Sequence, residues 1–189
     1  MAFSFINKEK QAAKQYTKEA EEGDVWAQYD LGRCYANGEG VEKDMKKAVY
    51  WFTKAAEQGK AKAQHNLGVS YANGEGVEKD QNKAVEWFTK AAEQGNADAQ
   101  NNLGRCYHYG MGVEKDWKKA AYWYTKAAEK GNANAKINLS ILGRCYDKGE
   151  GVEKDMKKAI EGFTKTVEQG YADAQYNLGM CYANGRGWR

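Results

Sequence analysis

Cysteine and histidine are the residue types most suited to metal binding or nucleophilic chemistry, and this chain has six of them. They are Cys34, Cys106, Cys145, Cys181, His65 and His108. Zinc and redox sites usually place cysteines in close pairs such as Cys-x-x-Cys, but the chain has no such pair and no two histidines near each other. We therefore expect reduced, buried cysteines and surface histidines, with no metal, cofactor or redox site.

The sequence also lacks the motifs of common enzyme classes. It contains no His-Glu-x-x-His, no Gly-x-x-x-x-Gly-Lys-Ser/Thr, no Gly-x-Gly-x-x-Gly and no Gly-x-Ser-x-Gly. The recurring segment Gly-Glu-Gly-Val-Glu-Lys-Asp ends in an acid and has no hydroxyl for magnesium, so we interpret it as a turn. We expect no enzymatic activity.

Glycines at a fixed interval show that the chain is built from repeats. The steps are 36 residues, except for one of 39, in the series Gly23, Gly59, Gly95, Gly131 and Gly170. Repeats of this length form stacks of small units that cannot bury their apolar faces alone. The sequence therefore predicts one elongated all-α domain that offers an extended surface and no enclosed active site.

The sequence predicts that each repeat forms a first helix (helix A), a glycine loop and a second helix (helix B). In the first repeat we expect helix A at 24–36 and helix B at 45–58, with Asp44 as N-cap and Gly59 after the last turn. Later repeats offer the caps Asp80, Asp116 and Asp155. Residues 8–22 read as a lone helix B and residues 171–183 as a lone helix A. The predicted boundaries are 1–22, 23–58, 59–94, 95–130, 131–169 and 170–189, the first and last being half repeats.

Helix A has two faces of constant composition and one stripe that varies between repeats. In the first repeat Ala27, Leu31 and Cys34 share one constant face, which is typical of a packed helix. Constant packing faces beside a variable stripe indicate a free surface adapted to a partner. The candidate binding residues on this stripe are Trp26, Tyr29, Asp30, Arg33, Lys62, His65, Asn66, Asp98, Asn101, Asn102, Arg105, Tyr109, Arg144, Lys148, Asp173, Tyr176 and Asn177.

The residue types on the stripe favour a protein or peptide partner. Arg33, Arg105 and Arg144 share one equivalent position, and arginine grips carboxylates bidentately, so an acidic peptide or a C-terminal carboxylate is a suitable ligand. The alternative is a solvated arginine paired with an acid of a neighbouring repeat. The recurring asparagines either bond the backbone of an extended ligand or satisfy internal polar groups. The aromatic residues are of the types that dominate interface energetics.

Two irregularities interrupt the repeat. The fourth repeat has three extra residues between Ala135 and Leu142, which we expect to be absorbed by a bulge or a wider entry turn, with Ile137, Leu139 or Ile141 partly exposed. After Gly187 the pattern calls for another helix B, but the chain ends with Trp188 and Arg189. Helix A of the last repeat would then leave Ala174, Leu178 and Tyr182 partly uncovered. Self-association through this end is the alternative function.

Composition excludes other classes of protein. Lys and Arg number 29 and Asp and Glu 26, so the net charge of +3 is too balanced to indicate nucleic-acid or membrane-surface binding. The chain has no proline and no apolar run long enough to span a membrane. Because the N-terminus lacks a basic leader, we expect a cytoplasmic protein, and leave open the alternative of a removed signal sequence.

The repeat resembles the Sel-1-like repeat family, whose signature is Ala-x-x-x-Leu-Gly-x-x-Tyr-x-x-Gly-x-Gly-Val, Asp-x-x-Lys-Ala and Trp-[Phe/Tyr]-x-Lys-Ala-Ala-Glu-x-Gly. Residues 63–95 meet it in full, and the resemblance covers about residues 9–187. It implies a right-handed, tetratricopeptide-like α-solenoid of antiparallel helix pairs, with helices A on the concave side. It also implies work as a scaffold or adaptor that binds proteins or peptides in the concave groove.

The chain departs from the cysteine-rich secreted branch of that family. Members of that branch carry a cysteine pair that bridges each repeat, whereas here the second cysteine is missing throughout. Disulfide stapling and secretion are therefore not expected. Penicillin binding, linked to some members of that branch, has no support either, because the chain contains no Ser-x-x-Lys.

Overall fold

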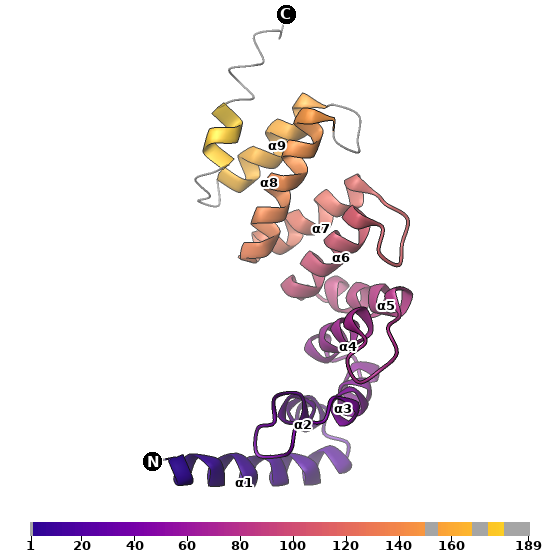
Figure 1. Ribbon diagram of the computed structural model, residues 1–189, viewed down its shortest axis with the longest axis vertical. Coiled ribbons are helices and arrows are strands. Elements are labelled where there is room, and N and C mark those ends of the chain that lie inside the picture. Colours follow the sequence, from indigo (N-terminus) through magenta and orange to yellow (C-terminus); the bar gives the residue numbers. More distant parts are fainter. Residues whose placement is uncertain (1, 150–154, 168–173, 180–189) are drawn as a thin grey trace, which may run out of the picture. The chain divides into compact units, whose positions relative to one another are not determined.

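The computed structural model describes residues 2–149, 155–167 and 174–179 of the chain. All regular structure in these ranges is helical, including residues 174–179, which have no helix label. The labelled helices (Figure 1) are α1 (Ala2–Glu21), α2 (Val25–Asn37), α3 (Met45–Glu57), α4 (Ala61–Asn73), α5 (Gln81–Glu93), α6 (Ala97–Tyr109), α7 (Trp117–Glu129), α8 (Ala133–Lys148) and α9 (Met156–Val167).

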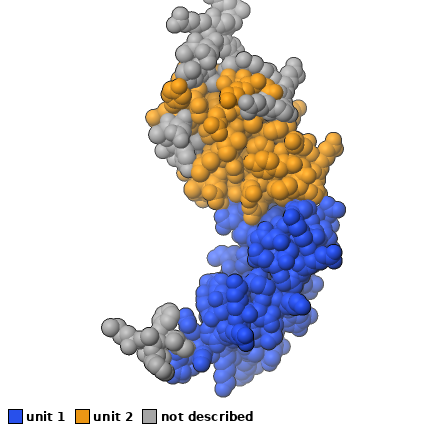
Figure 2. All heavy atoms as spheres, in the orientation of Figure 1, with its two compact units in different colours: residues 1–99 blue, residues 100–189 orange. Residues whose placement is uncertain are grey.

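The chain divides into two compact units, residues 1–99 and 100–189, which Figure 2 shows in different colours. In the first unit α1, α2, α3 and α4 each pack against the next helix along the chain. In the second unit α7 packs against α8, and α8 against α9. Each unit is therefore a stack of helices A and B in sequence order, as the repeat predicts.

The predicted aspartates cap helices B. The Asp44 carboxylate accepts hydrogen bonds from the backbone amides of Lys46 and Lys47, both at 3.0 Å. Its own backbone N–H donates to the Tyr35 carbonyl of α2 at 2.9 Å. One residue thus satisfies orphan donors at the start of α3 and ties that start to α2. The equivalent caps Asp80, Asp116 and Asp155 make the same two kinds of contact.

The paired loop glycines have separate tasks. Gly38 ends α2 in the left-handed conformation at φ 78°, and its N–H donates to the Cys34 carbonyl, which is the usual way to close a helix. Gly40 also has positive φ, and a Cβ there would overlap the Glu9 carbonyl of α1. Gly76 lies in the same way against the Met45 carbonyl of α3. The second glycine therefore lets these two loops contact the preceding helix B.

The core of each repeat forms where an aromatic ring of helix B lies on a glycine of helix A. Phe88 of α5 is 3% exposed, and its ring lies against Gly68 of α4. The pairs Phe52–Gly32 and Tyr124–Gly104 are arranged alike. Buried alanines and leucines such as Ala63 and Leu67 surround these rings. Glycine in mid-helix is unfavourable, so its recurrence here reflects this close contact.

Buried glutamines link consecutive repeats in the first unit. The amide nitrogen of Gln28 on α2 donates to the Ala20 carbonyl near the end of α1 at 3.2 Å, and its oxygen accepts from Gln58 at 2.8 Å. Gln64 does the same one repeat later, with the Ala56 carbonyl at 3.1 Å and with Gln94 at 2.7 Å. Each relay adds a side-chain hydrogen bond to a carbonyl at the end of the preceding helix, which also accepts from the backbone N–H of Gly23 or Gly59.

Helix boundaries differ modestly from the predictions. The first helix begins at Ala2 rather than at Lys8, while α2 and α3 lie within one residue of their predicted ends. Part of the predicted last helix, 171–183, lies outside the described residues, as do Tyr182 and Trp188. Ala174 is buried rather than uncovered, and the half-buried Leu178 packs against the cluster that contains Phe163.

The three-residue insert is not a bulge, contrary to the prediction. It lies within α8, a continuous α-helix of 16 residues where the other helices A have 13. Leu139 and Leu142 are three residues apart and share a face, so both are buried, together with Ala135. Ile137 is exposed at 39% and Ile141 is half-buried. The helix therefore absorbs the insert by burying a longer stripe.

The insert rotates the end of α8 about its axis relative to the equivalent part of α2. Three added residues turn a helix by about 300°, which leaves a net rotation of about 60°. Accordingly, Tyr146 is buried and Cys145 half-buried, whereas Cys34 is buried and Tyr35 half-buried at the equivalent positions of α2.

None of the helices in the described ranges combines the length and apolar composition needed to cross a bilayer.

Candidate functional site

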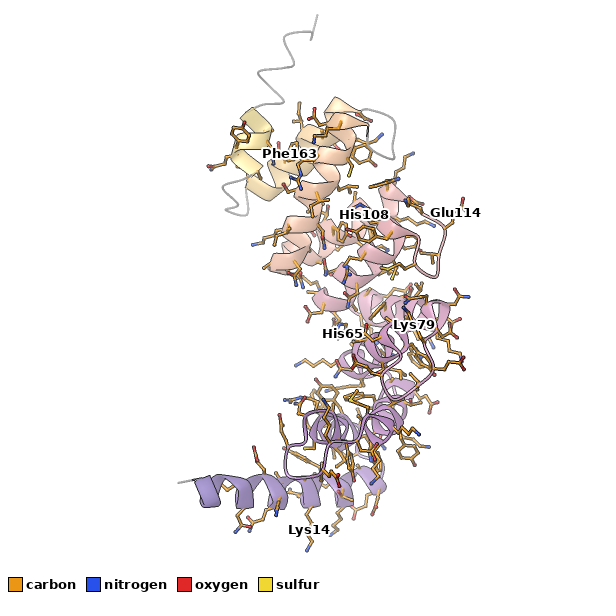
Figure 3. All side chains as sticks on the ribbon, in the orientation of Figure 1. Lys14, His65, Lys79, His108, Glu114 and Phe163 are labelled. Atoms are coloured by element: carbon orange, nitrogen blue, oxygen red, sulfur yellow. The ribbon has the colours of Figure 1, made fainter. Side chains whose placement is uncertain are left out.

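The predicted stripe on α2 and α4 comes together as one surface of the first unit. Trp26 is 66% exposed, and Arg33 is exposed beside the half-buried Tyr29 and Asp30. On the neighbouring helix A, Lys62 is exposed, and His65 and Asn66 are half-buried. Figure 3 labels His65 on α4. The residues of the two helices contact each other, so we call this set the α2–α4 surface.

Lys60 completes the aromatic corner of the α2–α4 surface, although the sequence prediction omitted it. Its ammonium lies directly over the Trp26 ring and 5.8 Å from the centroid of the Tyr29 ring. Burial, and then the charge of Lys62, lower the Lys60 pKa. A cation over aromatic faces is attracted by the ring quadrupole. This corner therefore presents a positive charge held on a flat apolar surface.

The signal for Lys60 is its place in the repeat. At the equivalent N-cap position, Asp24, Asn96 and Asn132 each accept a backbone hydrogen bond from their helix. Lys60 makes no such bond at the start of α4. Losing a cap costs about 1 kcal/mol. The lysine thus stands in place of a stabilising cap at the start of α4, where its ammonium lies over the exposed Trp26.

Arg33 keeps its guanidinium available on this surface. Its Nη1 lies 3.7 Å from the Asp30 carboxylate, one turn earlier in α2, and its Cζ lies 6.0 Å from the centroid of the Tyr29 ring. Solvent-exposed ion pairs contribute only about 0–1 kcal/mol. Exchanging Asp30 for another carboxylate would therefore cost little.

Asn66 joins the two helices of the surface. It is hydrogen-bonded to the Tyr29 side chain of α2, and its amide oxygen lies 3.2 Å from His65 Nδ1. Burial raises the pKa of Tyr29, against the opposing effects of the Arg33 charge and of the Asn66 hydrogen bond. Burial likewise lowers the pKa of His65, so this ring is neutral at pH 7. Neutral polar groups thus flank the charged Arg33.

A cavity of about 210 Å³ opens between α2, α3 and α4. Arg33 and Asn37 line it from α2, and Asn66 lines it from α4. Its apolar wall includes Phe52 and Met45 of α3, and the acidic side chain of Glu75 lines it as well. A few polar groups converging on an apolar wall are typical of a binding site. The predicted residues Arg33 and Asn66 therefore meet at one cavity.

The stripe on the second unit matches the prediction less closely. Arg105, Tyr109 and Arg144 are exposed as predicted. Asn101, however, is 6% exposed, and its oxygen accepts a hydrogen bond from Asn138 Nδ2 at 2.9 Å. Asn101 is therefore part of the packing between α6 and α8, because a buried amide needs an internal partner. It is not a surface contact residue, and its place in the predicted stripe is wrong.

The remaining stripe residues fall into three groups. Asp98, Lys148 and Tyr176 are exposed, and Tyr176 has 70% of its surface accessible. Asn102 and Asn177 are half-buried. Asp173 lies outside the described residues.

His108 is buried. The prediction that both histidines lie on the surface is therefore wrong for His108. It is 4% exposed and sits between Tyr109, stacked at 4.4 Å, and Trp117 at 4.6 Å. Its Nδ1 lies 3.3 Å from the Tyr124 hydroxyl. Figure 3 labels it within the second unit. Burial, assisted by the charge of Lys115, lowers its pKa.

The sequence held a signal for this buried pair. Tyr124 stands where the first two repeats have Phe52 and Phe88, and His108 stands where they have the alanines Ala36 and Ala72. A buried phenol needs a hydrogen-bond partner. The two substitutions occur in the same repeat because the hydroxyl and the imidazole satisfy each other. This pair is a core feature with no exposure to a ligand.

The cysteines among the described residues belong neither to the α2–α4 surface nor to the predicted stripe on the second unit. Cys34 and Cys106 are buried free thiols, and Cys145 is a half-buried one. Burial raises the pKa of Cys106 to about 11, against a small opposing effect of Arg105. Its thiol is therefore protonated and unreactive at neutral pH. Cys181 lies outside the described residues.

Comparison with protein families agrees with the repeat structure. The model of the Sel1 repeat matches residues 27–60, 61–96, 97–132, 134–171 and 172–188. The chain belongs to the Sel1 repeat family. Its fold is therefore an α-solenoid, and proteins built from Sel1 repeats generally mediate protein–protein interactions and are typically non-enzymatic scaffolds. A search of curated proteins gives no significant match.

Solved Sel1 repeat structures are similar to this chain. A Sel1 repeat protein from Oxalobacter formigenes is 40% identical with a TM-score of 0.79, over 95% of this chain and 73% of that one. A protective antigen of uropathogenic Escherichia coli with an SLR fold is 40% identical with a TM-score of 0.74. That match covers 92% of this chain, which spans only 36% of the antigen. Helicobacter pylori cysteine-rich protein B is 31% identical, with a TM-score of 0.45, over 71% of this chain and 94% of that one.

Proposed function

We propose that this chain is a scaffold or adaptor that binds a segment of a partner protein on the α2–α4 surface. The observation that carries the proposal is the cavity of about 210 Å³ lined by Arg33 and Asn66, from two successive helices A. Helix A of one repeat and helix A of the next vary in sequence here, while their packing faces stay constant.

An extended peptide with a carboxylate suits the chemistry of this surface. Arg33 offers a bidentate donor whose present partner, the half-buried Asp30, lies 3.7 Å away and is weakly held. Asn37 and Asn66 provide amides that can pair with a peptide backbone. Trp26, under the Lys60 ammonium, provides a large rigid contact about two turns before Arg33 on α2. The partner group is accordingly an acidic side chain or a C-terminal carboxylate beside an apolar residue.

A peptide library with free C-termini, selected on the full chain, tests this proposal. We expect enriched peptides to carry a carboxylate, and fluorescence anisotropy to give their affinity. Removing a charged group from a desolvated pair costs about 2–5 kcal/mol of binding. Arg33→Ala should therefore weaken binding by at least 30-fold, and Asn66→Ala should weaken it by less.

Lys54→Ala is the matched control, because Lys54 is an exposed cation of the same repeat that lies over Tyr50 on helix B. It should leave affinity unchanged within twofold. Circular dichroism would confirm that every variant is folded. Peptides that bind the wild type and Arg33→Ala equally well would refute the α2–α4 surface as the binding site.

A further inference from the structure

A second cavity lies in the second unit, on the side of helices B. It has a volume of about 210 Å³, is partly open to solvent and is lined by α7, α8 and α9. Ala121 of α7, together with Leu139, Leu142 and Tyr146 of α8, provides apolar walls, and Gly162 of α9 lies at its edge. Protein interiors contain few voids larger than a water molecule. An apolar cavity of this size therefore needs an explanation.

The repeat pattern explains how the cavity arises. Trp51, Trp87 and Trp123 occupy one position of helix B in the first three repeats, and the step of 39 residues places Gly162 there in the fourth. The opposite wall is reduced as well, because Ala121 stands where earlier helices B have Val49 and Val85. Both changes remove side-chain volume from the same place.

The tryptophan of an intact repeat shows what this place normally holds. Trp87 packs against the buried cluster that includes Val49 and Leu67. Val49 lies in the helix B before that of Trp87, just as Ala121 lies in the helix B before that of Gly162. Leu67 lies in the helix A of the same repeat as Trp87, just as Leu142 lies in the helix A of the same repeat as Gly162. The cavity is thus the space that an indole ring fills in the earlier repeat.

The aromatic–glycine contact between α9 and α8 is kept beside the cavity, which Gly143 also lines. Phe163 is 1% exposed and lies against Gly143, as the aromatic–glycine pairs of the other repeats do. Figure 3 labels Phe163 on α9. A Cβ at Gly162 would have ordinary contacts of 3.4 Å with Gly143 and Leu139. A side chain can therefore start from position 162 without a clash with the backbone of α8.

We propose that this cavity binds a planar aromatic group of about the size of an indole. An apolar cavity of about 150 Å³ in another protein binds benzene, and a bicyclic ring suits a somewhat larger space. Two exposed side chains that also line the cavity add polar contacts: Lys118 provides a cation for the ring face, and Glu161 provides an acceptor for the indole N–H. Lys158 lines the cavity too, but its ammonium is paired with Asp155 and lies over the Tyr146 ring. The site lies on other helices than the α2–α4 surface and does not depend on the function proposed for it.

Fluorine NMR of 5-fluoroindole added to the full chain tests the proposal. We expect a saturable broadening or shift of the ligand resonance with the wild type. Gly162→Trp restores the residue of the earlier repeats and should weaken binding at least tenfold. Ala121→Phe fills the same cavity from α7 and provides a second variant with the same expected loss. Tyr122→Trp adds an indole at an exposed position of α7 and should leave binding unchanged.

The source of the aromatic group is resolved by two further arms. N-acetyl-5-fluorotryptophanamide represents a tryptophan side chain of a polypeptide, and stronger binding than that of 5-fluoroindole would assign the site to a protein ligand. Weaker binding would assign it to a free aromatic compound. Repeating both titrations with Trp188→Ala shows whether the chain's own tryptophan competes for the site. The proposal is overturned if no probe binds saturably in either background, or if Gly162→Trp and Ala121→Phe bind as the wild type does.

Discussion

Replacing Gly68 by alanine tests whether the aromatic–glycine contact organises each repeat. In an unconstrained helix interior this change stabilises by about 0.8–1 kcal/mol, because alanine has the higher helix propensity. Here the added Cβ would lie 2.6 Å from Cδ1 of Phe88 and 2.7 Å from Cε1, and 3.3 Å from the Ala84 carbonyl. Carbon atoms in contact normally lie about 3.5–4.0 Å apart. The ring must therefore move by roughly 1 Å.

Phe88 has little freedom to make that movement. It is 3% exposed, and Ala84, Val85, Ala91 and Ala92 of its own helix are buried with it. Overpacking of a core typically costs about 1–3 kcal/mol. We therefore expect Gly68→Ala to lower the free energy of unfolding by about 0–2 kcal/mol relative to the wild type, in spite of the gain in propensity.

Gly179→Ala is the matched control. Gly179 is helical and exposed, and a Cβ there would meet no atom within 4 Å. It carries the propensity gain alone, so the difference between the two variants isolates the overpacking cost at about 1–3 kcal/mol. Urea unfolding followed by circular dichroism measures it. The double variant Gly68→Ala, Phe88→Leu should recover much of the loss, because it removes the ring that is displaced.

Equal stabilities of the two glycine variants, within about 0.5 kcal/mol, would refute the reasoning. So would a loss in the Gly68→Ala variant that Phe88→Leu does not relieve. The first result would mean that the ring moves freely, and the second that the cost arises from the Ala84 carbonyl instead.

Two further predictions concern the buried histidines. Tyr124→Phe should cost about 0.5–1.5 kcal/mol, although Phe is the residue of the first two repeats, because it leaves His108 without its hydroxyl partner; a double-mutant cycle with His108→Ala should show coupling of similar size. Burial lowers the pKa of His65 and of His108, so their contribution to stability is present above the unfolded-state pKa of about 6.5 and is lost as the pH falls below it. Lowering the pH from about 7.5 to about 5 should thus lower the urea concentration at the midpoint of unfolding. The decrease should be smaller for the double variant His65→Gln, His108→Gln.

The sequence was sufficient to predict the repeat and its helix caps because both depend on local chemistry. Asp44 and its equivalents precede a helix B, and each was found to accept backbone hydrogen bonds there. The insert in α8 was harder to predict because two solutions satisfy the same pattern. A bulge keeps both ends in register, whereas a continuous helix needs apolar residues three apart, and Leu139 and Leu142 supply them.

For the candidate site, the exposure of a side chain was easier to predict than the residue with which it makes a hydrogen bond or contact. The variable stripe identified Arg33 and Asn66, which do line one cavity. It also included Asn101, because helical spacing alone does not show that Asn138 lies within hydrogen-bonding distance. Lys60 was missed because its position is a cap in other repeats, and its contact with Trp26 joins residues 34 positions apart in sequence.

The glutamine relays of the first unit make successive repeats interchangeable. Gln28 and Gln64 reach back to carbonyls at equivalent positions, Ala20 and Ala56, and accept from equivalent donors, Gln58 and Gln94. A copy of one 36-residue segment inserted after another would find each donor and acceptor already in place. An array held in this way can grow or shrink by gene duplication or deletion, with no new contact to be evolved at the junction.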